Sequence, residues 1–99
     1  MAYTIDIDLA AIQDLQKAID YYDEQLSGLG RKFEMAIDKH FSALRKNPFY
    51  QIRYDDVRCF PVKKFPFMIH FTVDEEIKTV RVSAVFHTSM DPDENWVKS

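Results

Sequence analysis

The stretch FPFMIHFTVDEEIKTVRVSAVFH, residues 65–87, alternates apolar and polar side chains on both sides of the charged segment DEEIK. Alternation with a period of two is typical of a β-strand that buries one face, and a short polar segment between two such runs is typical of a turn. The stretch therefore predicts a β-hairpin with one apolar face. That face carries Phe65, Phe67, Ile69, Phe71 and Val73 in the first strand, and Val80, Val82, Ala84 and Phe86 in the second.

If the two apolar faces of the hairpin coincide, only registers that differ by an even number of residues compete, because a slip of one residue would turn one face toward solvent. The predicted register pairs Val73 with Val80, Phe71 with Val82, Thr72 with Arg81, and His70 with Ser83. This register leaves the other face of the sheet open, with Arg81 near its middle and His87 at the strand end. The open face is predicted to carry Met68, His70, Thr72, Arg81, Ser83 and His87.

Two amphipathic helices are predicted before the hairpin. The segment SGLG separates them, because it holds the only two glycines of the chain and glycine tolerates the left-handed conformation found at helix ends. Residues 31–46 form the second helix, whose apolar side includes His40 as a packed side chain, and the pair Asn47 and Pro48 ends it. Residues 9–26 form the first helix, with an apolar stripe at spacings of three and four: Ile12, Leu15, Ile19, Tyr22 and Leu26.

The remaining alternating segments complete the sheet. Residues 3–8, YTIDID, predict an N-terminal strand followed by Asp8 as a candidate helix cap. Residues 57–65, VRCFPVKKF, predict a further strand with Pro61 at an edge or bulge. The predicted fold class is α+β: an N-terminal strand, an antiparallel helical hairpin and an antiparallel β-meander, in the order β-α-α-β-β-β, with the helices on one sheet face. The length suits a single domain over residues 1–99.

Composition limits the class of protein. Cys59 is the only cysteine, so we expect no internal disulfide and a reducing compartment, the cytoplasm. No apolar run approaches the ~20 residues that cross a bilayer, and the N-terminus lacks a signal-peptide pattern, so we expect no membrane partner. The net charge is −3, yet residues 31–64 hold nine bases and four acids. This middle segment predicts either a local basic patch or a solvated helix face with charged strand rims.

Few motifs in the sequence carry chemistry. The three histidines are far apart and belong to no HExxH or CxxC pattern, and two glycines cannot build a phosphate loop, so we expect neither metal nor cofactor. General acid–base cleavage of RNA remains open, since it needs a base, positive charge at the phosphate and an acid for the leaving oxygen. The residues of suitable type are Arg58, Lys63, Lys64, Arg81 and His87. Alternatively, Arg81 only solvates its strand, the two lysines lie on a rim, and His87 bonds to the C-terminal tail.

Four segments follow one another across nearly the whole chain: DLAAIQDLQKAIDYYDEQLSGLGRKF, LRKNPFY, VRCFPVKKFPFMIHFTVDEE and VRVSAVFHTSMDPDENW. Their order and spacing resemble toxins of the RelE/ParE superfamily, from bacterial type II toxin–antitoxin (plasmid stabilisation) systems. The resemblance implies the same fold as the residue pattern. It also implies growth arrest as the effect and a cognate antitoxin as the partner, in a hetero-oligomer that neutralises the toxin.

The resemblance implies different targets for different branches. ParE-like members poison DNA gyrase by protein contact, for which the middle basic segment and Trp96 would supply contact surfaces. RelE-like members cut mRNA on the ribosome. In that case Arg81 would stabilise the phosphate and His87 would shuttle a proton, while Arg58, Lys63 and Lys64 would hold the substrate.

Met90 departs from the family pattern, which usually has an arginine three residues after the histidine that matches His87. An uncharged thioether cannot stabilise a phosphoryl transition state. This departure and the acidic net charge favour gyrase over the ribosome as the target. Met90 also leaves open an inactive relative that acts only as an antitoxin partner and co-repressor.

Overall fold

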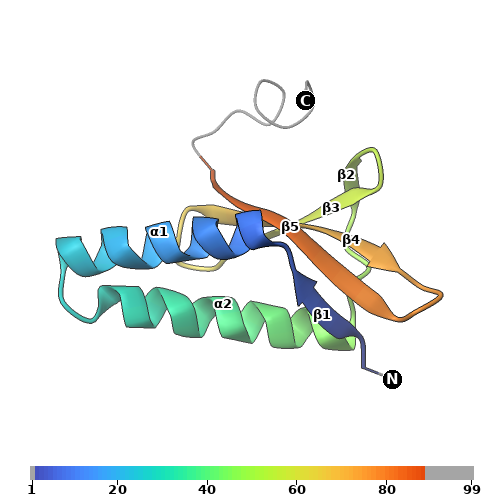
Figure 1. Ribbon diagram of the computed structural model, residues 1–99, viewed down its shortest axis with the longest axis horizontal. Coiled ribbons are helices and arrows are strands. Elements are labelled where there is room, and N and C mark those ends of the chain that lie inside the picture. Colours follow the sequence, from blue (N-terminus) through green and yellow to red (C-terminus); the bar gives the residue numbers. More distant parts are fainter. Residues whose placement is uncertain (1, 89–99) are drawn as a thin grey trace.

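The computed structural model describes residues 2–88, which form two helices and a five-stranded sheet. Along the chain the elements are β1 (Thr4–Ile7), α1 (Leu9–Gln25), α2 (Leu29–Lys46), β2 (Ile52–Tyr54), β3 (Val57–Pro61), β4 (Phe67–Asp74) and β5 (Thr79–His87). The strand order is β1-β5-β4-β3-β2, in which β1 runs parallel to β5 and the other neighbours are antiparallel. Both helices cover the same face of this sheet (Figure 1).

This architecture confirms the predicted α+β class, the helical hairpin and the antiparallel meander. It adds the short strand β2, and it ends the strand predicted over residues 57–65 at Pro61. Within residues 2–88, no helix combines the length and the hydropathy that crossing a membrane requires.

The core lies between α2 and the sheet. Helix α2 turns four large side chains inward at helical spacing: Phe33, Ile37, Phe41 and Leu44. The sheet contributes five side chains that are at most 2% exposed: Ile69, Phe71, Val80, Val82 and Val85. Burying each such side chain contributes ~1.5–3 kcal/mol, so apolar contact is the main force that holds α2 on the sheet.

Helix α1 packs through small residues. Ala11 and Ala18 are its buried positions, whereas Ile12 and Leu26, at the two ends of the predicted stripe, are 48% and 62% exposed. The predicted stripe is therefore correct only in its middle, and the two alanines missing from it are the buried residues of the helix. The partly buried members that pack against the core are Leu15, Ile19 and Tyr22.

The two glycines between the helices are required for different reasons. Gly28 has a φ of 89°, the left-handed conformation that the sequence predicts. Gly30 lies against α1, where an added Cβ would come within 2.5 Å of the Ile19 carbonyl oxygen. Its N–H also donates to Asp23 Oδ1 at 2.8 Å. Close approach of the two helices, rather than an unusual backbone angle, therefore requires glycine at position 30.

A β-bulge interrupts the pairing of β4 with β5. Near the turn the predicted register is confirmed, with Thr72 opposite Arg81. Farther along, His70 pairs with Ala84 instead of the predicted Ser83, so Ser83 is the additional residue of the bulge.

The bulge exchanges the faces of the residues that follow it. Val85, 2% exposed, and His87 now point toward the helices, where Ala84 and Phe86 were predicted. The Val85 N–H donates to Asp14 Oδ2 of α1 at 3.1 Å, so a helix side chain satisfies a backbone donor that adjoins the bulge. The prediction for the second half of β5 is wrong because a simple alternation count cannot detect an inserted residue.

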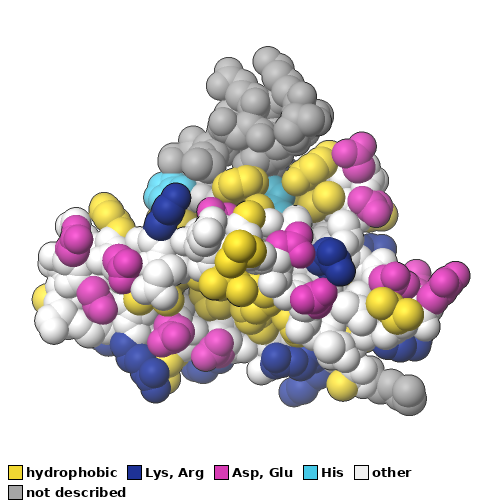
Figure 2. All heavy atoms as spheres, viewed as in Figure 1, with side chains coloured by type: hydrophobic (Ala, Val, Ile, Leu, Met, Phe, Trp, Pro, Cys, Tyr) yellow, Lys and Arg dark blue, Asp and Glu magenta, His cyan; other side chains and the backbone are white. Residues whose placement is uncertain are grey.

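Charge is unevenly distributed over the surface. In Figure 2, acidic side chains are spread across the visible face, including the lower margin over α2, where several basic side chains also lie. Helix α2 carries five basic and two acidic residues, on a protein that is acidic overall.

Candidate functional site

Arg81 and His87 lie on opposite faces of the sheet. Arg81 opposes Thr72 and points away from the helices, with 59% of its side chain exposed. His87 opposes Phe67, with ring centroids 5.2 Å apart, and lines a small hollow against α1 together with Lys17, Ala18 and Tyr21. The prediction that both side chains are exposed on the open face is therefore wrong, and the bulge at Ser83 is the reason.

Arg81 is engaged by two carboxylates. One guanidinium nitrogen lies 3.2 Å from Asp6 Oδ2, and another lies 3.7 Å from Asp8 Oδ1. Asp8 is the N-cap residue of α1, as predicted, but its side chain makes no capping hydrogen bond and faces Arg81 instead. A phosphate at Arg81 would have to displace both acids. Exposed ion pairs of this kind contribute only ~0–1 kcal/mol, so their effect is chiefly to occupy the cation.

His70 is the centre of a buried cluster on the open face. It is 0% exposed, its Nδ1 lies 3.1 Å from the Tyr54 hydroxyl and 3.6 Å from Cys59 Sγ, and its ring lies 5.1 Å from that of Phe86. The sequence predicted His70 on this face but not Tyr54, because the three-residue strand β2 carries too short an alternation to be recognised. Cys59 is also buried, with 7% of its surface exposed.

The environment of His70 favours its neutral form. Burial, aided by the positive charge of Arg53, lowers the pKa of His70 from 6.5 to about 4. Burial likewise raises the pKa of Cys59 and the pKa of Tyr54. All three groups are therefore uncharged near pH 7, and a histidine with so low a pKa is a poor proton shuttle there. Among residues 2–88, no three His, Cys, Asp or Glu side chains are grouped in a way that could hold a metal ion.

Arg58 contacts the segment of the chain that follows α2. It opposes Phe71, whose side chain is in the core, so Arg58 lies on the helix-covered face and not beside Arg81. Its guanidinium donates to the Tyr50 carbonyl oxygen at 2.7 Å and lies 5.4 Å from the centre of the Phe49 ring. Two other residues named from the sequence, Met90 and Trp96, lie outside the described part of the chain.

Lys63 and Lys64 belong to the turn between β3 and β4, and they line a groove of about 650 Å³ between this turn and α2. We call it the lysine groove. Lys32 and Lys39 of α2 complete its basic lining, and most of its other residues are apolar: Met35, Ala36, Ala43, Phe60 and Phe65. The sequence named the first two lysines but missed the α2 pair, although their spacing of seven residues was a signal that they share a helix face.

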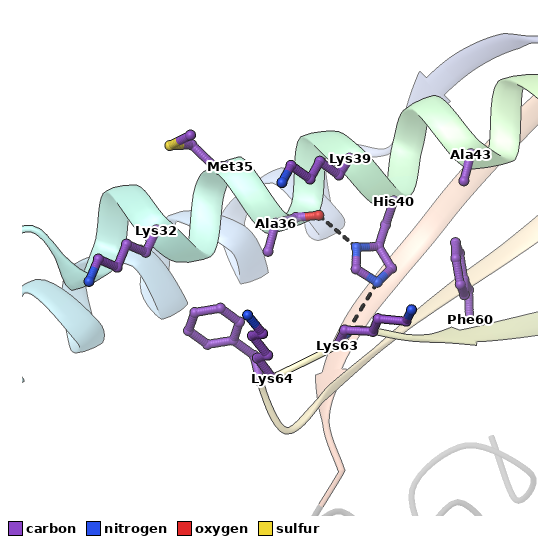
Figure 3. Close-up of a pocket in the computed structure, with 10 residues that line it drawn as sticks. Lys32, Met35, Ala36, Lys39, His40, Ala43, Phe60, Lys63 and Lys64 are labelled. Carbon is purple, nitrogen blue, oxygen red and sulfur yellow. Dashed lines mark hydrogen bonds between the residues drawn. The ribbon is translucent and has the colours of Figure 1, made fainter.

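His40 joins the two walls of the lysine groove (Figure 3). It is 8% exposed, its Nδ1 lies 2.6 Å from the Ala36 carbonyl oxygen, and its Nε2 accepts from the Lys63 N–H at 3.1 Å. Because a carbonyl oxygen only accepts and an amide N–H only donates, these bonds assign the neutral imidazole with its proton on Nδ1. The prediction of a packed histidine is confirmed. Through its two hydrogen bonds, His40 connects α2 to the β3–β4 turn.

The family of the chain is given by a match over residues 5–92 to the model of the ParE toxin of the type II toxin–antitoxin system parDE. Because this match spans most of the sequence, the chain belongs to the ParE toxin family, and the predicted RelE/ParE superfamily membership is confirmed. No curated protein matches the chain significantly.

Solved structures of related systems share the fold. The chromosomal ParDE toxin–antitoxin system from P. aeruginosa aligns with a TM-score of 0.74 and 18% identity, covering 87% of this chain and 96% of that one. The intact E. coli RelBE complex aligns with a TM-score of 0.68 and 19% identity, over 87% and 96% of the two chains. The RelBE2 complex from Mycobacterium tuberculosis aligns with a TM-score of 0.62 and 20% identity, over 88% and 99%. At such identities the likeness extends to the fold alone.

Proposed function

We propose that this toxin arrests bacterial growth in the cytoplasm by binding DNA gyrase, and that a cognate antitoxin neutralises it in a hetero-oligomer. The contact surface for gyrase is the basic side of α2 with the β3–β4 turn, which includes the lysine groove. The proposed antitoxin partner is supported by the structural relatives, since the RelBE neighbours from E. coli and M. tuberculosis are named as toxin–antitoxin complexes.

The observation that carries the choice of gyrase is the separation of Arg81 from His87 by the sheet itself. An acid–base group must come within hydrogen-bond reach of the atom it protonates, and the charge-stabilising cation must contact the same phosphate. Side chains on opposite faces of one sheet cannot do this together. The two carboxylates at Arg81 and the low pKa of His70 argue in the same direction, against nucleolytic chemistry on the open face.

A supercoiling assay with purified gyrase tests the proposal. We expect the purified toxin to inhibit supercoiling, and we expect Lys39→Glu, in the lysine groove, to weaken inhibition by tenfold or more. Lys17→Glu on α1 makes the same charge change away from the groove and is the matched control. Unchanged supercoiling at toxin doses that arrest growth would refute gyrase as the target.

Primer extension on translated mRNA tests the competing endonuclease function. The endonuclease hypothesis requires that Arg81→Ala and His87→Ala abolish cleavage while the fold persists. Our proposal instead predicts no toxin-dependent cuts with the wild-type chain, and cuts that disappear in both variants would overturn it.

A further inference from the structure

We infer that the lysine groove binds one free long-chain carboxylate, an anionic amphiphile whose alkyl chain lies on the apolar floor and whose head pairs with lysines. The inference goes beyond the proposed function. It rests on the volume, the lining and the charge of the groove, and it holds whether or not gyrase is the target.

The groove has the size of a small-molecule site. Its volume of about 650 Å³ falls within the ~300–1,000 Å³ that is typical of ligand sites in proteins. Its wall on α2 runs from Lys32 to Ala43, and the residue steps between them, at ~1.5 Å each, give a length of ~16 Å. An extended carbon chain advances ~1.2 Å per bond, one third of the rise of an extended residue, so this length holds ~12–14 carbons.

The two ends of the groove differ in character. In Figure 3, three lysine side chains end on one side of His40: those of Lys32, Lys39 and Lys64. The other side holds Ala43 and Phe60 beside a single lysine, Lys63. A carboxylate head would therefore pair with the three lysines, and the alkyl chain would extend across His40 toward Ala43.

The charge of the groove favours an anion. Among the residues that the structure describes, four lysines and no acidic side chain line it, and five of the other lining residues are apolar. Like charges that share one site repel each other, so an anion bound among the lysines would relieve their repulsion. A lysine can also cover apolar surface with its own alkyl stem, an arrangement that needs no ligand. A comparison of ligands with different head groups separates these two cases.

Other classes of ligand fit the groove less well. Nucleic acid gains affinity by stacking its bases on exposed aromatic faces. Phe60 is already stacked on Tyr50, with ring centroids 4.3 Å apart, and Phe65 packs edge-on against Tyr22 and Phe33. A purely polar anion would leave the apolar floor without a partner, and a neutral hydrocarbon would leave the lysines without one. The flat surface of a bilayer would not reach the floor, so the inferred ligand is a free molecule.

The groove is preformed. The two hydrogen bonds of His40 fix the β3–β4 turn against α2 in the free chain, so binding need not order this wall. Lys64 has a φ of 70°, a left-handed conformation that costs a lysine more than it costs a glycine. The turn thus keeps a cation at the rim of the groove, at a position where glycine would suit the backbone better.

Isothermal titration calorimetry with dodecanoate, below the concentration at which it forms micelles, tests the site directly. Hexanoate keeps the head but loses half of the chain, and dodecyltrimethylammonium keeps the chain but inverts the charge of the head. We expect one dodecanoate to bind per protein chain, at least tenfold more tightly than either control ligand. Equal binding of dodecanoate and the cationic amphiphile would show adventitious apolar contact only and would overturn the inference.

Charge variants locate the ligand. Lys39→Glu should weaken dodecanoate at least fivefold. Lys17→Glu makes the same charge change on α1, beside the small hollow of His87, and should alter binding less than twofold. Lys64→Gly should raise the melting temperature by relieving the left-handed lysine, yet weaken dodecanoate at least threefold. Equal losses in Lys39→Glu and Lys17→Glu, or unchanged binding in Lys64→Gly, would contradict a site in the groove.

A groove-filling variant tests the direction of the alkyl chain. Ala43→Leu keeps the charge and shortens the apolar end, whereas Ala10→Leu adds the same side chain at an exposed position of α1. Wild type and Ala10→Leu should prefer dodecanoate to decanoate at least threefold, because two more methylenes are buried. In Ala43→Leu this preference should disappear. General damage to the structure would weaken both ligands equally, and an unchanged preference would refute the assigned direction and with it the inference.

Two further measurements separate this inference from its alternatives. Tighter binding to phosphatidylglycerol vesicles than to free dodecanoate, lost in Lys39→Glu, would overturn the inference in favour of a membrane surface. If the toxin binds dodecanoate but does not inhibit gyrase supercoiling, the site stands and only the proposed function fails. If the toxin inhibits gyrase but does not bind dodecanoate, the proposed function stands and the inference is refuted.

Discussion

The hydrogen bond from the Val85 N–H to Asp14 should stabilise the bulged strand, and Asp14→Ala removes its acceptor. The bond is 3.1 Å long and partly buried. A hydrogen bond to a charged group contributes ~1.5–3 kcal/mol, and leaving the donor unpaired adds a desolvation cost. Alanine recovers up to ~0.7 kcal/mol through its higher helix propensity. The expected net loss in the free energy of unfolding is therefore ~1–2 kcal/mol.

Asp20→Ala is the matched control, because Asp20 lies on the same helix and its only described contact is an exposed hydrogen bond to Gln16 at 2.9 Å. It gains the same helix propensity, so the difference between the two variants isolates the bond to Val85 at ~2 kcal/mol. Urea unfolding followed by circular dichroism measures this difference. For a domain of this size it corresponds to a melting temperature lower by ~8–16 °C in Asp14→Ala.

Amide hydrogen exchange supplies the second measurement for the same bond. The Val85 amide should exchange faster in Asp14→Ala, while Asp14→Asn, which keeps a carbonyl acceptor, should lie between the two. The reasoning is refuted if Asp14→Ala and Asp20→Ala unfold within ~0.5 kcal/mol of each other, the range expected of surface substitutions.

Three further predictions follow from the fold. Gly30→Ala should destabilise the chain by ~2 kcal/mol or more, measured by urea unfolding, because the new Cβ meets backbone rather than a flexible side chain. Deleting Ser83 should preserve the heteronuclear NMR signals around Val85 and His87, because the strand pairs on either side of Ser83 would then form one regular ladder. Loss of folding would show that the bulge is required. The pKa of His70 is lowered to about 4 in the folded chain, so as the pH falls this histidine is protonated in the unfolded chain first. The free energy of unfolding should therefore be full above pH ~6.5 and fall by up to ~3 kcal/mol toward pH ~4. Urea unfolding of wild type and His70→Phe at pH 7 and pH 4.5 measures that loss, which the variant should lack.

The pattern of apolar residues along the chain predicts the elements and the arrangement of the layers. The two periodicities, near 3.6 in residues 9–46 and 2 in residues 65–87, select helices and strands because the side chains of each element must share one buried face. The pairs near the β4–β5 turn were narrowed to registers that differ by an even number of residues, because a slip of one residue would turn one apolar face toward solvent. The structure has the register in which Thr72 opposes Arg81. The position of His40 in the interior also followed from its place on the apolar side of α2.

Which candidate residues lie close together depends on contacts between the elements. The inserted residue Ser83 cannot be recognised from the alternation of apolar and polar residues, because each half of β5 alternates correctly by itself. The Asp14 carboxylate of α1 accepts from the Val85 N–H next to the bulge. That insertion moved His87 away from Arg81. The lysine groove likewise needed Lys32 and Lys39 to come beside Lys63 and Lys64 from more than twenty residues away in the chain. The order of apolar residues within one element depends on which face of that element is buried. A functional site depends instead on contacts between elements, and the residue pattern of a single element does not encode these.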